Sequence, residues 1–310
     1  MVSDVVIFGG SGFIGRNLAA ALADSGKRVT AISRRPLPLS HENITSVKAD
    51  FGDVSTYERY IREGHTVVQL VNGINPRTGN GQLLHDIEHE VFPHIRFLEL
   101  CASRGVCRVI FASSGGAVYG NAPIVPTSEE VVPTPQNSYG VVKLMIEKYY
   151  DLFHLTHDLD FVTLRLSNPY GPSQEYRSAQ NFLIPSIIEK LQHDQEMTIY
   201  GDGEDARDFV YIDDVVAAFC SAIERQALFH RLLNIGGGGC LTINAIVSEI
   251  EAVAGRNIRR KYIEGDGSSV RQSHLDISLA AKELGWKPQI GLRPGLIQTL
   301  RGEGFTQFNQ

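Results

Sequence analysis

A tyrosine and a lysine stand four residues apart, at Tyr139 and Lys143, in a stretch whose pattern predicts a helix. On a helix this spacing places both side chains on one face, one turn apart. A free phenol has a pKa near 10, so about 0.1% is ionised at pH 7, and a neighbouring ammonium group favours the phenolate. The pair is therefore a candidate for acid–base catalysis in which Lys143 lowers the pKa of Tyr139; the alternative is an ordinary pair on a helix surface.

A glycine-rich loop follows the first apolar run of the chain. Gly9, Gly12 and Gly15 lie in the sequence GGSGFIG, between a Val- and Ile-rich segment and an amphipathic one. Glycine there lets the backbone turn tightly, brings N–H groups close to a pyrophosphate, and packs a helix closely on a sheet. The loop predicts a dinucleotide site, with a purely structural turn as the alternative.

The choice of dinucleotide depends on the end of the second strand-like run. Ser33 stands where an acidic residue would bind the ribose 2′-hydroxyl, and Arg34 and Arg35 follow it. Two guanidinium groups suit a 2′-phosphate, while the alternative is a solvated basic pair on a surface loop. Asp50 and Phe51, after the third strand, would lie near the adenine or form an ordinary turn. These residues leave NAD and NADP open.

Strand-like and helix-like patterns alternate in the segments that would position these residues. Val- and Ile-rich runs lie at 4–8, 29–32, 66–71, 108–112 and 161–166, with amphipathic stretches at 17–25, 84–104 and 139–156. This alternation predicts an α/β fold with a doubly wound parallel Rossmann sheet over residues 1–167. Further helices are expected at 181–192, 213–225, 243–254 and 277–284, with short strands between them. We predict a smaller mixed α/β lobe over 168–310, mainly substrate-binding, from which residues 208–235 return to the Rossmann domain.

Composition excludes several classes of protein. The chain has 310 residues, 43% of them hydrophobic and 21% charged, and its net charge is −6, which argues against sequence-independent binding to nucleic acid or to an anionic membrane. The four cysteines have neither the spacing of a disulfide framework nor that of a zinc site, so we expect no metal. The longest uncharged apolar stretch is about nine residues, 215–223, and the N-terminus has no signal-peptide pattern, so we expect a cytoplasmic protein.

Several motifs follow one another in a recognisable order. They are the GGSGFIG loop, SSGGAVYG from Ser113, Tyr139 with Lys143, RLSNPYGP from Arg165, and the segment from Gly201 to Asp214. Together they resemble the extended short-chain dehydrogenase/reductases, and most closely the nucleotide-sugar epimerase/dehydratase group, which is typified by UDP-glucose 4-epimerase. The resemblance implies NAD or NADP as cofactor, a nucleotide-sugar substrate, and a homodimer formed through the helices at 84–104 and 139–156.

The resemblance also implies a role for each matching position. Tyr139 would be the acid/base, and Lys143 its electrostatic partner, which also holds the nicotinamide ribose. Besides these two, the cofactor-binding residues would be Gly9, Gly12, Phe13, Ile14, Gly15, Ser33, Arg34, Asp50, Phe51, Leu70, Val71 and Ser113. The substrate-binding residues would be Asn168, Asn181, Phe182, Arg207 and Arg271, of which Arg207 matches an arginine that pairs with the substrate diphosphate.

The catalytic hydroxyl departs from the family pattern. The family's catalytic Ser or Thr stands where this chain has Gly115, so we expect Ser114 to take its role. Because side chains alternate along a strand, Ser113 shares the parity of Gly115, and Ser114 would serve only if the chain leaves strand geometry there.

Other departures surround the same site. Glu90 replaces a frequent Asn and would be either an extra base or a solvent-facing side chain, and Pro93 and His94 replace Gly and Thr. The segment 69–72 lacks the usual His-Leu-Ala pattern that lines the cofactor. An arginine often found five residues before Arg271 is Asp266, which leaves open whether Arg271 supplies a second phosphate contact.

These observations favour a nucleotide-sugar 4-epimerase that oxidises C4 and reduces it again from the other face. The alternative is an NADPH-dependent reductase of a nucleotide-linked 4-keto-6-deoxy sugar. A dehydratase is disfavoured because Gly116 and Ala117 replace the acidic pair of that subgroup. A hypothesis of another class is a non-catalytic binding or sensor protein that keeps the fold.

Overall fold

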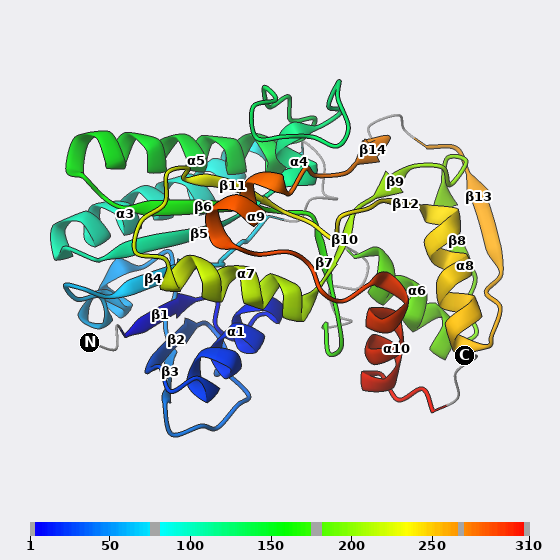
Figure 1. The fold of residues 1–310 in the computed structure, drawn as a ribbon, viewed down its shortest axis with the longest axis horizontal. Coiled ribbons are helices and arrows are strands. Elements are labelled where there is room, and N and C mark those ends of the chain that lie inside the picture. Colours follow the sequence, from blue (N-terminus) through cyan, green and yellow to red (C-terminus); the bar gives the residue numbers. More distant parts are fainter. Residues whose placement is uncertain (1–3, 75–80, 175–181, 266–269, 307–310) are drawn as a thin grey trace.

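The Val- and Ile-rich runs form one parallel sheet in the computed structural model, which describes residues 4–74, 81–174, 182–265 and 270–306 (Figure 1). The sheet has seven strands in the order β11-β6-β5-β4-β1-β2-β3. Every neighbouring pair is parallel. Their bounds are β1 Val5–Phe8, β2 Val29–Ser33, β3 Ile44–Lys48, β4 Thr66–Gln69, β5 Arg108–Ser114, β6 Phe161–Leu166 and β11 Leu232–Ile235. The strand order reverses between β1 and β4, which confirms the predicted doubly wound α/β fold.

The sheet separates two hydrophobic cores, and β1 contributes to both. Val5 and Ile7 pack in one core with residues of α1 and α7, and Val6 and Phe8 pack in the other with residues of α3 and α5. Successive side chains of a strand point to opposite faces, so a run that is apolar at every position requires helices on both sides. Figure 1 shows this layering, with α1 Phe13–Asp24 and α7 Ile212–Glu224 on one side and α3 Phe92–Arg104 and α5 Ser138–His157 on the other.

The helix expected at 84–104 is interrupted near its start. It consists of α2 Leu83–Asp86, a π-helical turn Ile87–Val91, and α3. Pro93 lies in the first turn of α3 and has no N–H to donate to the preceding turn, which suits a local change of helical register. Asp86 and Glu90 are buried on this segment.

Shorter strands and helices make up the C-terminal part, most of them on the right of Figure 1, whereas α9 Ser278–Leu284 packs beside β11 and α7. Strand β7 pairs with β10, β8 pairs with β13, and β9 lies between β12 and β14. The strands are β7 Asn168–Tyr170, β8 Met197–Tyr200, β9 Ala206–Arg207, β10 Phe209–Tyr211, β12 Leu241–Thr242, β13 Arg260–Ile263 and β14 Gln272–Ser273; the helices are α6 Leu183–Gln192, α8 Ile243–Ala254, α9 Ser278–Leu284 and α10 Leu292–Gly302. This part is mixed α/β, and its assignment to substrate binding stays a prediction.

The described residues contain neither a helix suited to a membrane nor a cluster of metal-binding side chains. None of their helices is both long enough and apolar enough to cross a membrane. Within the same residues, no group of three or more His, Cys, Asp or Glu side chains is arranged to hold a metal ion.

Candidate active site

The glycine loop lies at the carboxyl end of β1, where the strand order reverses. Gly9 has a φ of +80°, and a Cβ on Gly15 would lie 2.2 Å from the Gly9 carbonyl oxygen. Gly12 is the N-cap of α1 and makes no side-chain hydrogen bond to the helix. The first N–H groups of α1 are therefore suited to bind an anion. Leu70 and Val71 leave β4 beside the loop, since a Cβ on Gly9 would lie 3.2 Å from the Leu70 carbonyl carbon. The backbone therefore fits a dinucleotide pyrophosphate.

Phe13 and Ile14 form the first turn of α1 and are half-buried. Both side chains pack against the core cluster on the α1 side of the sheet. They pack the helix start against the sheet next to the predicted pyrophosphate position.

The residues expected around the adenosine have different environments. Ser33 ends β2 and donates a hydrogen bond to the Arg35 carbonyl at 2.7 Å, and Arg34 is exposed. Asp50 is exposed and accepts a 2.9 Å hydrogen bond from the backbone of the turn that follows. The Phe51 ring, in contrast, is buried in an aromatic cluster with Phe8 and other core rings. Phe51 can therefore offer a ligand its backbone but not its ring.

Ser114, Tyr139 and Lys143 come together at the carboxyl end of β5. The Ser114 hydroxyl hydrogen-bonds the Tyr139 phenol, and the capping residue Asn137 accepts from the Gly140 N–H at 2.9 Å at the start of α5. Lys143 is 3% exposed, and its Nζ donates to the Ala112 carbonyl at 3.2 Å. The Lys143 Nζ lies 5.8 Å from the centre of the Tyr139 ring. The geometry suits a phenol that exchanges a proton beside an ammonium group.

The electrostatics of Tyr139 correct one expectation from the sequence. Burial raises the pKa of Tyr139 to about 12, the Ser114 hydrogen bond lowers it, and the Glu90 carboxyl raises it further. Burial also lowers the pKa of Lys143, against the opposing effect of Glu90. The expectation that Tyr139 is shifted toward its phenolate is therefore wrong for the protein without ligands, because burial outweighs the groups that favour ionisation. Tyr139 is a neutral phenol at pH 7.

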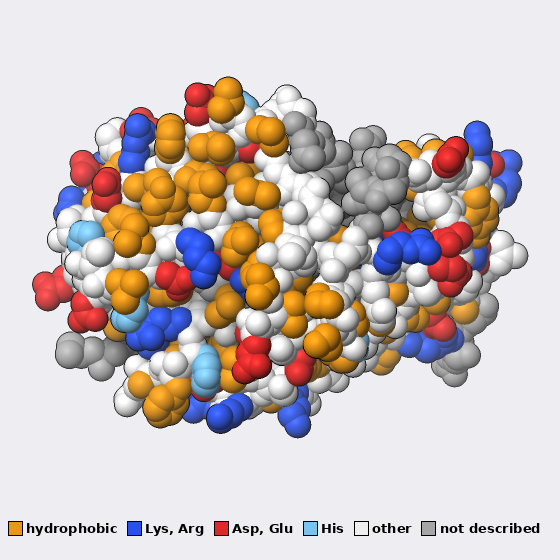
Figure 2. Space-filling view, turned by 90° about the horizontal axis from the view of Figure 1, so that it is seen from above, with side chains coloured by type: hydrophobic (Ala, Val, Ile, Leu, Met, Phe, Trp, Pro, Cys, Tyr) orange, Lys and Arg blue, Asp and Glu red, His pale blue; other side chains and the backbone are white. Residues whose placement is uncertain are grey.

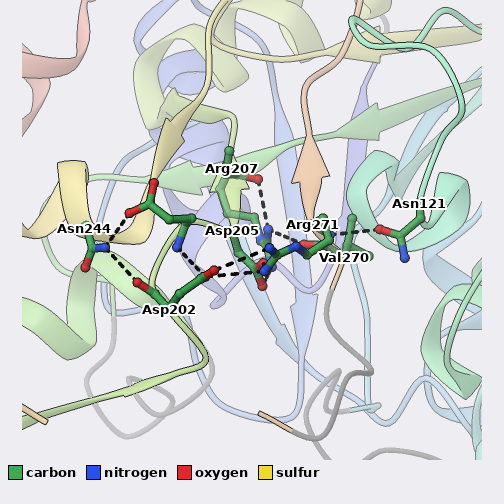
Figure 3. Close-up of polar contacts among 9 residues, drawn as sticks. Asn121, Asp202, Asp205, Arg207, Asn244, Val270 and Arg271 are labelled. Carbon is green, nitrogen blue, oxygen red and sulfur yellow. Dashed lines mark hydrogen bonds and ion pairs between the residues drawn. The ribbon is translucent and has the colours of Figure 1, made fainter. Parts of the chain in front are cut away.

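Two arginines predicted to bind substrate meet at one carboxylate (Figure 3). Arg207 donates from Nη1 to the Val270 carbonyl at 2.6 Å and lies 3.7 Å from Asp205. Arg271 lies 3.0 Å from the same carboxyl group and 3.4 Å from Asp202. Burial lowers the pKa of Arg207, and Asp205 opposes this shift. The structure brings Arg207 and Arg271 together, but with acidic partners that an anionic ligand would have to replace or share.

Of the other predicted substrate residues, the structure describes Asn168 and Phe182 but not Asn181. Asn168 begins β7, and its Nδ2 donates to the Asp208 carbonyl at 2.8 Å. Phe182 is 42% exposed and precedes α6. Asn181 and Asp266 lie outside the described residues.

Comparison with known proteins identifies the family. Residues 5–236 match the model described as the NAD dependent epimerase/dehydratase family. The chain belongs to this family. The resemblance to the nucleotide-sugar epimerase/dehydratase group is thereby confirmed.

Three relatives cover almost the whole chain. A UDP-glucose 4-epimerase of Mycolicibacterium smegmatis is 30% identical over 304 residues, which are 95% of this chain and 96% of that protein. A dTDP-4-dehydro-6-deoxyglucose reductase of Escherichia coli is 29% identical, over 96% of each chain. The solved structure of MoeE5 in complex with UDP-glucuronic acid and NAD is 31% identical, with a TM-score of 0.88, and the match covers 97% of this chain and 99% of that one.

The departure at Gly115 from the family pattern has a steric cause. A Cβ on Gly115 would lie 2.7 Å from the Leu275 side chain, so a serine at this position would collide with it. Ser113 donates to Glu147 at 2.5 Å, within a buried ion pair of Glu147 and Arg165. Ser114 keeps extended backbone geometry, and α4 (Gly115–Tyr119) begins immediately after it. Ser114 therefore reaches Tyr139 without the departure from strand geometry that we expected to be necessary, whereas the Ser113 hydroxyl is occupied elsewhere.

The departure at Glu90 also has a clear structural outcome. Glu90 is 3% exposed, so the solvent-facing alternative is wrong. Its Oε1 accepts a hydrogen bond from the Gly73 N–H, and its Oε2 is buried without a hydrogen-bond partner among the described residues. Residue patterns gave no signal for this burial, which occurs within the π-helical turn.

His94 forms hydrogen bonds with Gln69 and with the backbone of Glu90. The His94 Nε2 lies 2.8 Å from Gln69 Nε2, and its Nδ1 lies 2.6 Å from the Glu90 carbonyl oxygen. Burial and then Lys143 lower the pKa of His94 to about 3, so the ring is neutral. A neutral ring accepts from Gln69 and donates to the Glu90 carbonyl, which fixes the turn that carries Glu90.

Proposed function

We propose that the protein is an NAD(P)-dependent nucleotide-sugar 4-epimerase that oxidises C4 of the sugar and reduces it again from the other face. The observation that carries this proposal is the meeting of Ser114, Tyr139 and Lys143 at the sheet edge that also holds the glycine loop. The Mycolicibacterium relative is a UDP-glucose 4-epimerase, and the MoeE5 structure contains both a UDP-sugar and NAD, which supports the same substrate class and cofactor.

The chain supplies the groups that this reaction needs. A bound nicotinamide dinucleotide supplies the acceptor and donor of hydride. The N–H groups at the start of α1 bind its pyrophosphate, and Lys143 stabilises the phenolate form of Tyr139. Tyr139 removes the proton of the C4 hydroxyl and later returns it, with Ser114 hydrogen-bonded to the phenol. Arg207 and Arg271 give up their ion pairs with Asp205 and bind the substrate diphosphate instead.

A reductase of a nucleotide-linked 4-keto-6-deoxy sugar is the second candidate. Reduction of a ketone requires a protonated Tyr139 at the start of the cycle, which is the state that the raised pKa favours. The Escherichia coli relative is a reductase of this type. Arg34 is exposed after β2, where a 2′-phosphate would be bound, so we expect NADP(H) to bind at least as well as NAD(H).

Two measurements separate the candidates. Freshly purified protein is denatured and any released dinucleotide is identified by mass. The native protein is then incubated with UDP-, GDP-, dTDP- and CDP-sugars, with products read by NMR, and with a 4-keto sugar while NADPH is followed by absorbance. Epimer formation without NADPH consumption supports the epimerase, and steady NADPH oxidation replaces it with the reductase. Turnover of neither substrate class, in protein that binds dinucleotide, would favour a non-catalytic sensor.

We also propose that the protein is a homodimer that pairs through α3 and α5. Leu155 is 81% exposed and Leu152 is 47% exposed on α5, and Phe92 at the start of α3 is 50% exposed. Figure 2 shows hydrophobic side chains gathered over the face that includes α5. Light scattering of the wild type and of Leu155→Glu tests this arrangement, because a charge on a dimer face should give monomers. A wild-type monomer at micromolar concentration would contradict it.

A further inference from the structure

Glu90 has a carboxyl oxygen that lacks a partner in a buried position. The side chain is 3% exposed, and a Cβ on Gly73 would lie 2.6 Å from Oε1, so the carboxyl group fits tightly beneath the loop that follows β4. Oε1 accepts from the Gly73 N–H, but Oε2 has no hydrogen-bond partner among the described residues. A buried, unpaired polar atom costs free energy, which a bound ligand can recover.

The charged groups around Glu90 do not compensate its charge fully. Lys143 of α5 and Arg34 after β2 favour the carboxylate, whereas Asp86 of α2 opposes it, and the pKa of Glu90 is raised, chiefly by burial. The Lys143 ammonium group is already hydrogen-bonded to the Ala112 carbonyl. Tyr139 and His94, two further titratable neighbours of Glu90, are both neutral at pH 7. A further positive charge in this site would therefore be stabilised.

The proposed reaction brings such a charge to this site. Oxidation of a carbinol removes a proton from oxygen and a hydride from the carbon that bears it, so the hydride acceptor must lie next to the group that takes the proton. That group is Tyr139, and Glu90 acts electrostatically on both Tyr139 and Lys143. An oxidised nicotinamide ring carries one positive charge, and the reduced ring carries none.

We propose that Glu90 is a specificity-determining residue that makes the site prefer the oxidised dinucleotide over the reduced one. This inference rests on the proposed use of a nicotinamide dinucleotide. In the proposed oxidation, C4 would transfer hydride, which carries the electron pair of the C–H bond, to a bound nicotinamide ring, and the ring would lose the positive charge that Glu90 attracts. The reduced ring lacks the attraction to Glu90 that stabilises the oxidised ring. The return of the same hydride to the ketone is therefore favoured. Such a bias suits an epimerase, whereas a reductase must bind the reduced form well.

The test is equilibrium binding of NAD⁺, NADH and ADP-ribose, and of NADP⁺ and NADPH, measured by calorimetry. Two unit charges roughly 8 Å apart at an effective dielectric constant of about 20 change an equilibrium constant by about thirtyfold. We expect Glu90→Gln to lower the ratio of Kd for the reduced form to Kd for the oxidised form by about ten- to a hundredfold. ADP-ribose lacks the nicotinamide ring, so its Kd should not change.

Two further variants control for charge and position. Glu90→Asp keeps the carboxylate and should keep the ratio within about threefold of wild type. Glu88→Gln removes an exposed acid from the same turn and should leave all constants unchanged. If circular dichroism shows that Glu90→Gln is unfolded, Glu90→Asn supplies a smaller neutral side chain.

The outcomes distinguish this inference from the proposed function. An unchanged ratio in a folded neutral variant overturns the inference while the dinucleotide site stands. Equal loss of ADP-ribose and dinucleotide binding also overturns it, because Glu90 would then only support the loop. Failure of the wild type to bind any dinucleotide or ADP-ribose overturns the proposed function together with the inference.

Discussion

The ionisation of Tyr139 gives the most direct test of the proposed chemistry. Its pKa of about 12 in the protein without ligands means that about one phenol in 100,000 is ionised at pH 7. Lowering this pKa to 7 would require five units, which correspond to about 7 kcal/mol. A positively charged nicotinamide ring roughly 5 Å away, at an effective dielectric constant of about 20, contributes about 3 kcal/mol, or slightly more than two units.

We therefore expect the oxidised dinucleotide to lower the pKa of Tyr139 to roughly 9–10, and not to neutrality. Phenolate is the base in sugar oxidation, so the rate of this half-reaction should rise with pH through that pKa and then level off. Phenol is the acid in ketone reduction, and the reduced ring carries no charge that would lower the pKa of Tyr139. The reverse half-reaction should therefore keep its rate to higher pH than the oxidation needs, and fall only toward the pKa of about 12 of the unliganded protein.

The assay is a tyrosinate absorbance titration of wild type minus Tyr139→Phe. The subtraction cancels the other tyrosines of the chain, which has 11 in total. The titration is run without ligand, with NAD⁺, and with ADP-ribose, which lacks the charged ring. A tyrosinate transition below pH 8 in the unliganded protein would refute the reasoning, because Lys143 would then outweigh burial. An equal shift with ADP-ribose would remove the ring charge as its cause.

Three further predictions concern the groups that support this chemistry. Ser114→Ala removes the hydrogen bond to Tyr139 and should lower kcat by about ten- to a hundredfold with little change in KM, measured by steady-state kinetics. Gly15→Ala places a Cβ 2.2 Å from a loop carbonyl and should weaken dinucleotide binding by at least about tenfold, while Gly239→Ala, with nothing within 4 Å, should not. Glu147→Gln leaves a buried guanidinium group without its carboxylate and should cost about 3–5 kcal/mol in urea unfolding; a loss below about 1 kcal/mol would show that the network is dispensable.

The sheet and the glycine loop were predictable because their signals are local. A run that is apolar at every position, such as Val5–Phe8, must be buried on both faces, and the glycine spacing directly follows it. The meeting of Tyr139 with Ser114 followed from motif order and from the alternation of strands and helices. The helix at Leu292–Gly302 and the short α4 were not predicted, because Pro294 and Gly295 near the start of the first and two glycines within the five residues of α4 are typical of turns.

The electrostatics were not predictable, because they depend on burial and on contacts between distant segments. The pKa of Tyr139 follows from its burial in the fold and from Glu90, which is buried within the π-helical turn. The pairing of Arg271 with Asp205 requires β14 to lie beside β9, a contact between segments more than sixty residues apart. Residue types identified the groups, but only the packed chain shows which charges oppose one another.

The two arginines that we propose to bind the substrate, Arg207 and Arg271, differ in how firmly the fold holds them. Arg207 is mostly buried and is fixed by the Val270 and Ala206 carbonyls, so its guanidinium group is already oriented when a ligand arrives. The Arg271 side chain is 67% exposed, and exposed ion pairs such as those with Asp202 contribute little to stability. A diphosphate can therefore separate Arg271 from its carboxylates at a small cost in free energy. Arg207 stays in place, so the diphosphate must bind where the Arg207 guanidinium group already lies. Because a preoriented group loses less entropy on binding, we expect Arg207 to contribute more to substrate affinity. Arg271, in contrast, can adjust its position to the bound substrate. Under the proposed function, this division lets an acidic protein accept an anionic substrate with few cationic side chains.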